Sequence, residues 1–159
     1  MSTELVAYFS AEGTTARVAR TLADERGADL CEIRPTTPYT QADLDWHDAH
    51  SRSSVEMHDE SARPAMQADL EGVAGYERIY LGFPIWWYRE PSIIDTFLEA
   101  YDLSGTDIVL FATSGSSGFG DTAERIRGLI GQGARVSEGT VFTASATDSD
   151  VDAWIAGLE

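Results

Sequence analysis

The chain has 159 residues, of which 43% are apolar and 24% are charged, so it can bury a core and is not expected to be disordered or collagen-like. It carries 27 acidic residues against 11 basic ones, every one of them arginine, and its formal net charge is −16. Because nucleic acids and anionic membrane surfaces are polyanions, neither is expected as a partner.

Five apolar segments that end in turn-forming residues are the candidate strands of a sheet. Three of them are almost continuously apolar, which is typical of parallel strands covered on both faces. The segments at 29–34 and 134–142 are weaker. In chain order, we predict strands at residues 4–10, 29–34, 78–84, 107–113 and 134–142.

Helical patterns separate these strands. The first places Val18, Leu22 and Ala23 at helical spacing and ends before Gly27, and a later one opens with Pro91 in a first-turn position. Strand and helix in alternation predict an open, doubly wound α/β sheet, formed by one domain over residues 1–159. In chain order, we predict helices at residues 14–26, 91–102, 120–130 and 149–158.

Residues 35–77 interrupt the alternation. Their periodicity is poor, so we expect a long surface excursion with a short helix near Met66 to Val73. Loops of this length are uncommon unless they are functional or mobile. The excursion is therefore a candidate functional segment.

Ligands of such sheets bind beyond the carboxyl ends of the strands, so the residues that follow each strand form the candidate site. The first strand is followed by Ser10-Ala11-Glu12-Gly13-Thr14-Thr15. Hydroxyl groups, a glycine and a helix N-terminus can hold a phosphate through backbone N–H groups, without any cation. The alternative is that Thr14 or Thr15 merely caps the helix.

Two further strand ends carry residues suited to a flat ring. "PIWWYREP" (Pro84 to Pro91) places aromatic side chains in a loop, where they can stack on a heterocycle or form a protein contact. "TSGSSGFG" (Thr113 to Gly120) has small residues that let a ligand approach the backbone, although a simple flexible turn would look the same. A phosphate loop, aromatic faces and backbone donors at neighbouring strand ends together predict a site for flavin mononucleotide (FMN).

Other phosphate-binding classes lack their motifs here. The chain has neither the Gly-Lys-Ser/Thr of a P-loop nucleoside triphosphatase nor the Gly-x-Gly-x-x-Gly of a dinucleotide-binding fold. The first loop contains no cysteine, which excludes a cysteine phosphatase, and the absence of lysine argues against a receiver domain.

The same residues resemble the flavodoxin family. The likeness is strongest to the flavodoxin-like branch marked by Gly-(Tyr/Phe)-Pro-Ile-Trp-Trp, here "GFPIWW" at Gly82 to Trp87, and it extends to "YFSAEGTT", "PSIIDTFLEAYDLSG", "FATSGSSGFG" and "DAWIAGL". The resemblance implies a flavodoxin-like three-layer α/β sandwich, with a five-stranded parallel sheet in the order 2-1-3-4-5 and helices on both faces. It also implies noncovalently bound FMN.

The resemblance assigns the phosphate to the first loop, the isoalloxazine ring to the loop after the third strand, and the ring edge to the loop after the fourth. The residues that it assigns to the cofactor are Ser10, Ala11, Glu12, Gly13, Thr14, Thr15, Pro84, Ile85, Trp86, Trp87, Thr113, Ser114, Gly115 and Gly118. Glu12 departs from the family, which often has threonine there, so somewhat weaker FMN binding is expected. In this family a glycine eases a peptide flip beside the flavin, and "PIWWYRE" has no glycine. The flipped conformation would therefore cost roughly 1 kcal/mol or more here, so the resemblance predicts largely two-electron chemistry.

Two redox functions are open. An electron carrier would dock a basic redox protein on its acidic surface. An FMN-dependent oxidoreductase would move electrons from NAD(P)H to a quinone or a similar small acceptor, with the 35–77 excursion covering the flavin. Arg89 can bind an anionic substrate or the charge of reduced flavin in such an enzyme, or it can form a surface ion pair with Glu90 or Asp95. A flavin-free interaction module built on the two tryptophans is a third, less supported interpretation.

The side chains of the excursion also have two open roles each. His47, His50 and His58 can carry protons in a covered site, or can lie in solvent. Tyr39 and Trp46 can close over the ring, or can pin the excursion to the body of the protein.

No apolar run reaches the ~20 residues that a membrane span requires, and the N-terminus does not read as a signal peptide. The single cysteine, Cys31, excludes an internal disulfide and fits a reducing compartment. We therefore expect a cytoplasmic protein. The sequence leaves the oligomeric state open.

Overall fold

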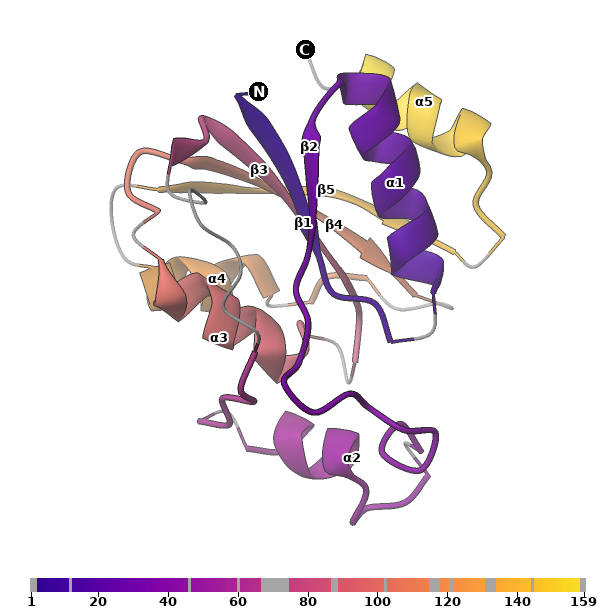
Figure 1. Cartoon of the computed structure of the whole chain (residues 1–159), viewed down its shortest axis with the longest axis vertical. Coiled ribbons are helices and arrows are strands. Elements are labelled where there is room, and N and C mark those ends of the chain that lie inside the picture. The colour runs from indigo at the N-terminus through magenta and orange to yellow at the C-terminus, as the bar shows by residue number, and fades with distance from the viewer. Residues whose placement is uncertain are drawn as a thin grey trace.

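The computed structural model describes residues 3–11, 13–45, 47–59, 61–66, 75–86, 89–101, 103–114, 118–120, 122–130, 134–143 and 145–157. Its elements stack in three layers, with a sheet between two pairs of helices (Figure 1). The strands are β1 (Glu4–Tyr8), β2 (Asp29–Glu32), β3 (Arg78–Pro84), β4 (Asp107–Thr113) and β5 (Arg135–Phe142). The helices are α1 (Thr14–Arg26), α2 (Arg52–Met57), α3 (Ser92–Ala100), α4 (Thr122–Ile130) and α5 (Asp148–Ala156).

Within the described residues, the strands form one parallel sheet in the order β2-β1-β3-β4-β5, which confirms the predicted order. β3 pairs with both β1 and β4. Its register runs from Arg78, opposite Glu4 and Asp107, to Pro84, opposite Thr113. The carboxyl ends of these three strands therefore lie side by side at one edge of the sheet, where ligands of doubly wound folds bind.

Helices cover both faces of the sheet, as predicted. Helices α1 and α5 lie on one face, and α3 and α4 lie on the other (Figure 1). In β1, Leu5 and Ala7 belong to the core under α3 and α4, whereas Val6 and Tyr8 belong to the core under α1 and α5. Since successive side chains of a strand point to opposite faces, burial of both faces explains why the strand is apolar throughout.

The observed boundaries differ from the predicted ones by one or a few residues. The first strand ends at Tyr8, so Phe9 and Ser10 already belong to the loop. The last helix begins at Asp148, one residue earlier than predicted, because Thr147 and Asp150 form a capping box. The Thr147 hydroxyl accepts from the Asp150 N–H, and the Asp150 carboxylate accepts from the Thr147 N–H.

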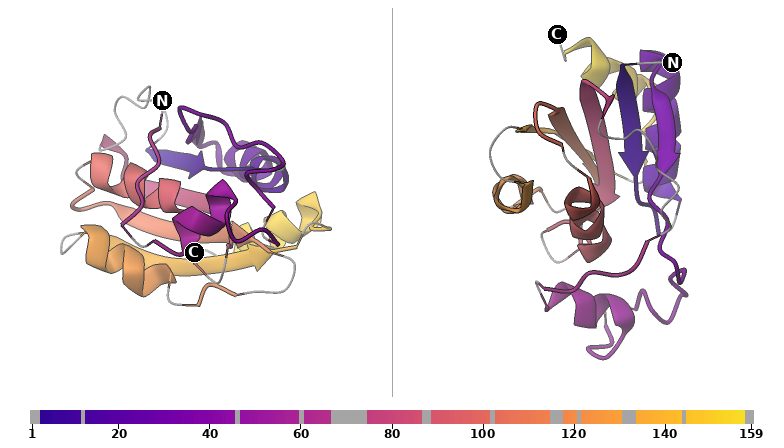
Figure 2. Two further views of the ribbon diagram at one scale, coloured as in Figure 1. Left: turned by 90° about the horizontal axis from the view of Figure 1, so that it is seen from below. Right: turned by 60° about the vertical axis from the view of Figure 1, so that its left-hand side comes forward.

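The excursion between β2 and β3 lies beyond the carboxyl ends of the strands (Figures 1 and 2). It contains α2, a short helix that the sequence did not predict, and the Ser51 hydroxyl caps this helix by accepting from the Ser54 N–H. The helix predicted near Met66 to Val73 falls almost wholly outside the described residues. Met66 itself forms an isolated antiparallel bridge with Pro35.

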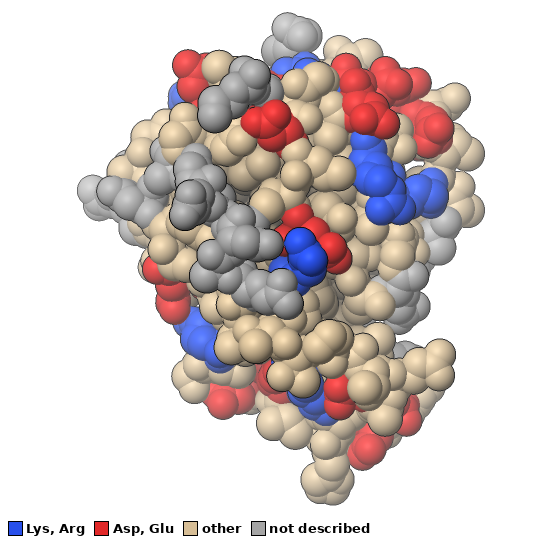
Figure 3. Space-filling view, in the orientation of Figure 1, with Lys and Arg blue, Asp and Glu red and all other residues tan. Residues whose placement is uncertain are grey.

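Carboxylate groups are spread over the molecular face in Figure 3, from the helices to the excursion, with arginines among them. This distribution agrees with the net charge of −16. In the part of the chain that the structure describes, no helix has the length and apolar character needed to cross a membrane.

Gly82 allows the two central strands to pack closely against an aromatic ring. A Cβ atom at Gly82 would lie 2.1 Å from Cζ of Phe111, its neighbour on β4. The Phe111 ring is fully buried and cannot turn into solvent. A side chain at position 82 would therefore displace the ring or the strand.

We expect Gly82→Ala to lower the free energy of unfolding by about 1–3 kcal/mol, as overpacked core substitutions do. Gly128→Ala is the matched control, because Gly128 is an exposed position of α4 with open space around its Cβ direction. That change should be neutral or stabilise by up to about 1 kcal/mol. Urea unfolding of the two variants measures both values, and equal effects would contradict the close approach at Gly82.

Candidate functional site

The first loop turns sharply into α1. The Ser10 hydroxyl oxygen accepts a hydrogen bond from the Gly13 N–H at 3.0 Å. Gly13 has φ 98°, a left-handed conformation that side chains rarely adopt, which explains why glycine stands directly before the helix. Ala11 lies between them and packs in part against the core. Glu12 lies outside the described residues.

The first N–H groups of α1 have no acceptor within the helix. Among the described residues no side chain caps the helix, so neither Thr14 nor Thr15 has the capping role weighed as the alternative. The N–H groups of Thr14, Thr15 and Ala16 belong to the first turn, where no intrahelical acceptor exists. Such N–H groups, together with the positive end of the helix dipole, favour an anion.

Two hydrogen bonds tie the three loops together. The hydroxyl groups of Thr15 and Thr113 lie 2.7 Å apart, and both residues are buried. The Ile85 N–H donates to the Thr113 carbonyl at 3.0 Å, just beyond the point where Pro84 pairs with Thr113 in the sheet. Thr113 therefore joins the phosphate-type loop to the aromatic loop. Ser114 follows it and donates its N–H to Phe142 of β5 at 2.9 Å.

Trp86 belongs to a small aromatic cluster at the same edge. Its ring packs edge-on against Phe9, at 5.7 Å between centroids, and against Tyr39, at 5.6 Å. Phe9 begins the first loop, directly after β1, and Tyr39 comes from the excursion. Edge-to-face packing at these distances is favourable. The cluster therefore connects the first loop, the second loop and the excursion.

Tyr39 is itself held from the side of α2. Its hydroxyl donates to the Glu56 carboxylate, and the Arg52 guanidinium lies 3.9 Å from its ring centroid. Burial, followed by the hydrogen bond to Glu56, raises the pKa of the Tyr39 phenol above its usual range. The phenol thus stays protonated, and its hydrogen bond lies within the excursion. The Tyr39 ring joins the excursion to the body of the protein through its contacts with Phe9 and Trp86.

The three histidines do not gather at the site. The side chains of His47 and His50 are 68% and 97% exposed. His58 is also exposed, and its ring nitrogen Nδ1 lies 2.7 Å from the Ser54 carbonyl. All three histidines therefore face solvent, which was one of the two placements considered for them from the sequence.

Arg89 is buried, which neither sequence interpretation anticipated. Its residue exposure is 7%, and its guanidinium donates to the backbone carbonyls of Glu56, Met57 and Glu90. It also lies 3.8 Å from the Asp95 carboxylate, one of the two partners proposed, although this pair is internal rather than on the surface. Both of its terminal guanidinium nitrogens donate to groups of the protein itself.

The remaining predicted residues divide into two groups. Gly118 is exposed, with open space where a Cβ would stand. Three predicted cofactor residues and one aromatic residue of the excursion lie outside the described residues, namely Glu12, Trp87, Gly115 and Trp46.

Sequence reasoning missed two features of the site. Phe9 was assigned to the first strand, although it packs against Trp86 from the loop. Glu90 and Asp95 were considered only as surface partners of Arg89, yet both are fully buried. A signal for Asp95 existed, because helical spacing places it on the stripe of α3 that includes Ile94 and Leu98.

The family model described as flavodoxin matches residues 3–158, which is nearly the whole chain. The chain belongs to the flavodoxin family. No curated protein sequence matches it.

Solved structures agree with this assignment. A protein from Bacteroides uniformis assigned as a flavoprotein is 44% identical, with a TM-score of 0.91 and 98% of each chain covered. One from Bacteroides eggerthii, assigned likewise, is 42% identical, with a TM-score of 0.87 over 99% of this chain and 98% of that one. A Lactobacillus acidophilus flavoprotein, solved in complex with FMN, shares the fold at 22% identity, with a TM-score of 0.67 over 98% and 99% of the two chains.

The Thr15–Thr113 contact makes a testable contribution to this flavodoxin-family site. Thr15→Val leaves the Thr113 hydroxyl buried without its partner, so we expect the free energy of unfolding to fall by about 1–3 kcal/mol. The double variant, Thr15→Val with Thr113→Val, should lose less than the sum of the two single changes, because both polar groups are then removed. Urea unfolding of the four proteins measures the coupling, and additive effects would show that the two hydroxyl groups do not interact.

Proposed function

We propose that this protein binds FMN noncovalently and carries electrons through it. The supporting observation is the uncapped N-terminus of α1, which opens at the edge of the sheet where Trp86 lies. Trp86 contacts Phe9, at the start of the first loop, and the Thr15 hydroxyl hydrogen-bonds to that of Thr113, at the end of β4. An anion site and an aromatic side chain are therefore neighbours, as a flavin with a phosphate tail requires.

The first loop would hold the phosphate. The N–H groups of Thr14, Thr15 and Ala16 lack intrahelical acceptors and suit phosphate oxygens. The Ser10 hydroxyl oxygen accepts from Gly13, so its own hydrogen stays available to donate. These donors are neutral, which fits a chain that contains no lysine.

The other two loops would hold the ring. Trp86 offers an aromatic surface that its edge-on neighbours keep in place, and Pro84 and Ile85 fix the start of that loop by pairing with Thr113. The backbone at Ser114 and Gly118 would supply donors to the ring edge. When bound, FMN supplies redox chemistry that no side chain at this edge provides.

A second candidate, an FMN-dependent NAD(P)H:quinone-type oxidoreductase, is favoured by the position of the excursion. Tyr39 contacts Trp86, and the Arg89 side chain anchors the carbonyl end of α2 to the loop after β3. A segment fixed across the carboxyl edge (Figure 2, left) limits access to that edge. It therefore suits a small acceptor better than a docking protein, which the carrier would need.

The phosphate assignment is tested by adding a negative charge at the first turn of α1. We expect Thr14→Asp to weaken FMN binding by about tenfold or more, through repulsion between the carboxylate and the phosphate. The same change should leave the apoprotein as stable or slightly more stable, since an acidic first-turn residue suits the helix dipole. Flavin fluorescence and absorbance titrations measure the affinity, and thermal unfolding measures the stability.

Riboflavin and Thr14→Ala are the controls for this experiment. Riboflavin lacks the phosphate, so its affinity should not change in Thr14→Asp, and Thr14→Ala removes the hydroxyl without adding charge. Equal losses for FMN and riboflavin would place the phosphate elsewhere. Wild-type protein that takes up no FMN would overturn the proposed function.

The two redox candidates are separated by one absorbance experiment on the FMN-loaded protein. An oxidoreductase should be bleached by NADPH and restored by a quinone within seconds. A carrier should be indifferent to NADPH and should exchange electrons with a basic redox protein, at a rate that falls as salt is raised. Fast NADPH turnover would exclude a pure carrier, and salt-dependent exchange without NADPH oxidation would exclude the oxidoreductase.

A further inference from the structure

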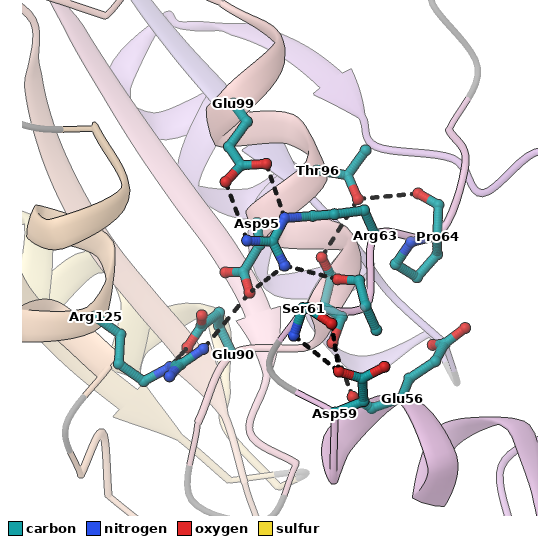
Figure 4. A network of polar contacts seen from close by, with 12 residues as sticks. Glu56, Asp59, Ser61, Arg63, Pro64, Glu90, Asp95, Thr96, Glu99 and Arg125 are labelled. Carbon is teal, nitrogen blue, oxygen red and sulfur yellow. Dashed lines mark hydrogen bonds and ion pairs between the residues drawn. The ribbon is translucent and has the colours of Figure 1, made fainter.

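Two carboxyl groups are buried beside the loop that follows β3. Glu90 lies at the end of that loop and Asp95 in the first turn of α3, and both side chains are 0% exposed. Three arginines surround them from different elements: Arg63 from the segment after α2, Arg89 from the loop itself, and Arg125 from α4. Figure 4 shows Arg63 and Arg125 approaching the pair from opposite sides.

Neither carboxyl group accepts a hydrogen bond from an N–H or hydroxyl group of the described residues. The nearest guanidinium nitrogens are 3.5 Å from Glu90 and 3.7–3.8 Å from Asp95, whereas a hydrogen-bonded guanidinium–carboxylate pair spans about 2.7–2.9 Å. The Arg125 guanidinium lies 3.5 Å from the Glu90 carboxyl group and 3.7 Å from that of Asp95, so the two buried carboxyl groups are neighbours. Neighbouring carboxyl groups can hydrogen-bond to each other only if one of them carries a proton.

Burial supports the same conclusion. Desolvation, and then the contact with Glu90, raise the pKa of Asp95 to about 9, although Arg63 and Arg125 act in the opposite direction. Arg63 gives its closest bonds, at 2.8 and 3.0 Å, to the Glu99 carboxylate and so only partly compensates the pair. With its pKa that far above neutral, the Asp95 carboxyl group keeps its proton at neutral pH.

The pair lies at the base of the turn that carries Trp86. Trp86 and Arg89 exchange backbone hydrogen bonds in both directions, at 3.0 and 3.1 Å, so Glu90 follows directly on the closed turn. The Arg89 side chain donates to the carbonyls of Glu56 and Met57 at the end of α2. The turn, α2 and α3 therefore meet at the carboxyl pair.

We propose that Glu90 and Asp95 share one proton at neutral pH and act as positioning residues, holding the Trp86 turn against α2 in the geometry that receives FMN. The part that concerns FMN rests on the proposed function. Loss of the shared proton leaves two adjacent buried carboxylates, which repel each other, and Glu90 moves the turn as it separates from Asp95. FMN affinity therefore falls when the pair ionises.

The first experiment measures the FMN dissociation constant of the wild type and of two variants between pH 6 and 10.5. For the wild type we expect a constant affinity up to about pH 9 and a loss of about tenfold per pH unit above it. Asp95→Asn and Glu90→Gln each replace the shared proton by an amide donor that does not titrate, so this loss should disappear in both. Ionisation of FMN itself is common to all the proteins and cancels in the ratio of their affinities.

Glu99→Gln is the matched control, because it removes an exposed carboxylate from Arg63 and leaves the buried pair intact. Its profile should still show the loss of affinity at high pH, because both buried carboxyl groups remain. Identical pH profiles for the wild type, Asp95→Asn and Glu90→Gln would overturn the positioning role.

A second experiment uses the apoprotein and needs no flavin. Infrared spectra at pH 7 should show the carbonyl stretch of a protonated carboxylic acid in the wild type and in Glu99→Gln, but not in Asp95→Asn or Glu90→Gln. A raised pKa means that the folded state holds a proton that the unfolded state releases, so stability falls as pH rises. The unfolding constant of the wild type relative to Asp95→Asn should therefore rise about tenfold per pH unit between about pH 5 and 9.

The two experiments separate the two claims. Absence of the acid band, with a pH-independent ratio of unfolding constants, would overturn the shared proton even if FMN binds. Failure of the wild type to bind FMN at pH 7 would overturn the proposed function, whereas the infrared and unfolding results would still decide whether the pair holds a proton.

Discussion

Parallel pairing of β3 with both β1 and β4 is the constraint on which the site depends. It brings the ends of three strands to one edge, and the residues that follow them become neighbours despite their distance in the sequence. Thr15 and Thr113, which lie 98 residues apart in the chain, bond directly. Ile85, the residue after the strand between them, donates its N–H to the carbonyl of the same threonine. The loops are thus fixed to one another as well as to their own strands.

The charge of the chain restricts how this edge can bind an anion. A protein of net charge −16 repels a phosphate from a distance, and it has no lysine to offset that repulsion locally. Backbone N–H groups at the start of α1 avoid the difficulty, because they are neutral donors already oriented by the helix. Gly13 makes this possible, since its left-handed backbone turns the chain into the helix without a side chain over the donors.

Much of the fold could be predicted from the sequence because it depends on local patterns. Continuous apolar runs marked the strands, and helical spacing with Gly27 and Pro91 marked two of the helices. Parallel strands have their carboxyl ends at one edge of the sheet, which predicted that the three loops lie close together. The strand order was predicted from the likeness to flavodoxins. The whole sheet order was confirmed.

The features that were missed depend on contacts between distant segments. Helix α2 has the sequence RSSVEM, which carries no helical stripe of apolar residues, and it is held by the Ser51 cap and by Arg89 from beyond β3. Arg89 could not be recognised as buried, because two of its acceptors are backbone carbonyls more than thirty residues away. Every residue has a backbone carbonyl, so the sequence does not indicate which one accepts a hydrogen bond.

The buried cluster around Asp95 cannot be explained by stability alone. Moving carboxylates and guanidinium groups out of water costs about as much as their attraction returns, and here the arginines stand too far from the pair for hydrogen bonds. A shared proton lowers that cost by removing one of the two negative charges. The cluster then specifies the geometry of this region, because an acid pair and three cations from four segments fit together in one arrangement. That arrangement fixes the turn before Glu90, and with it the tryptophan at the edge of the sheet.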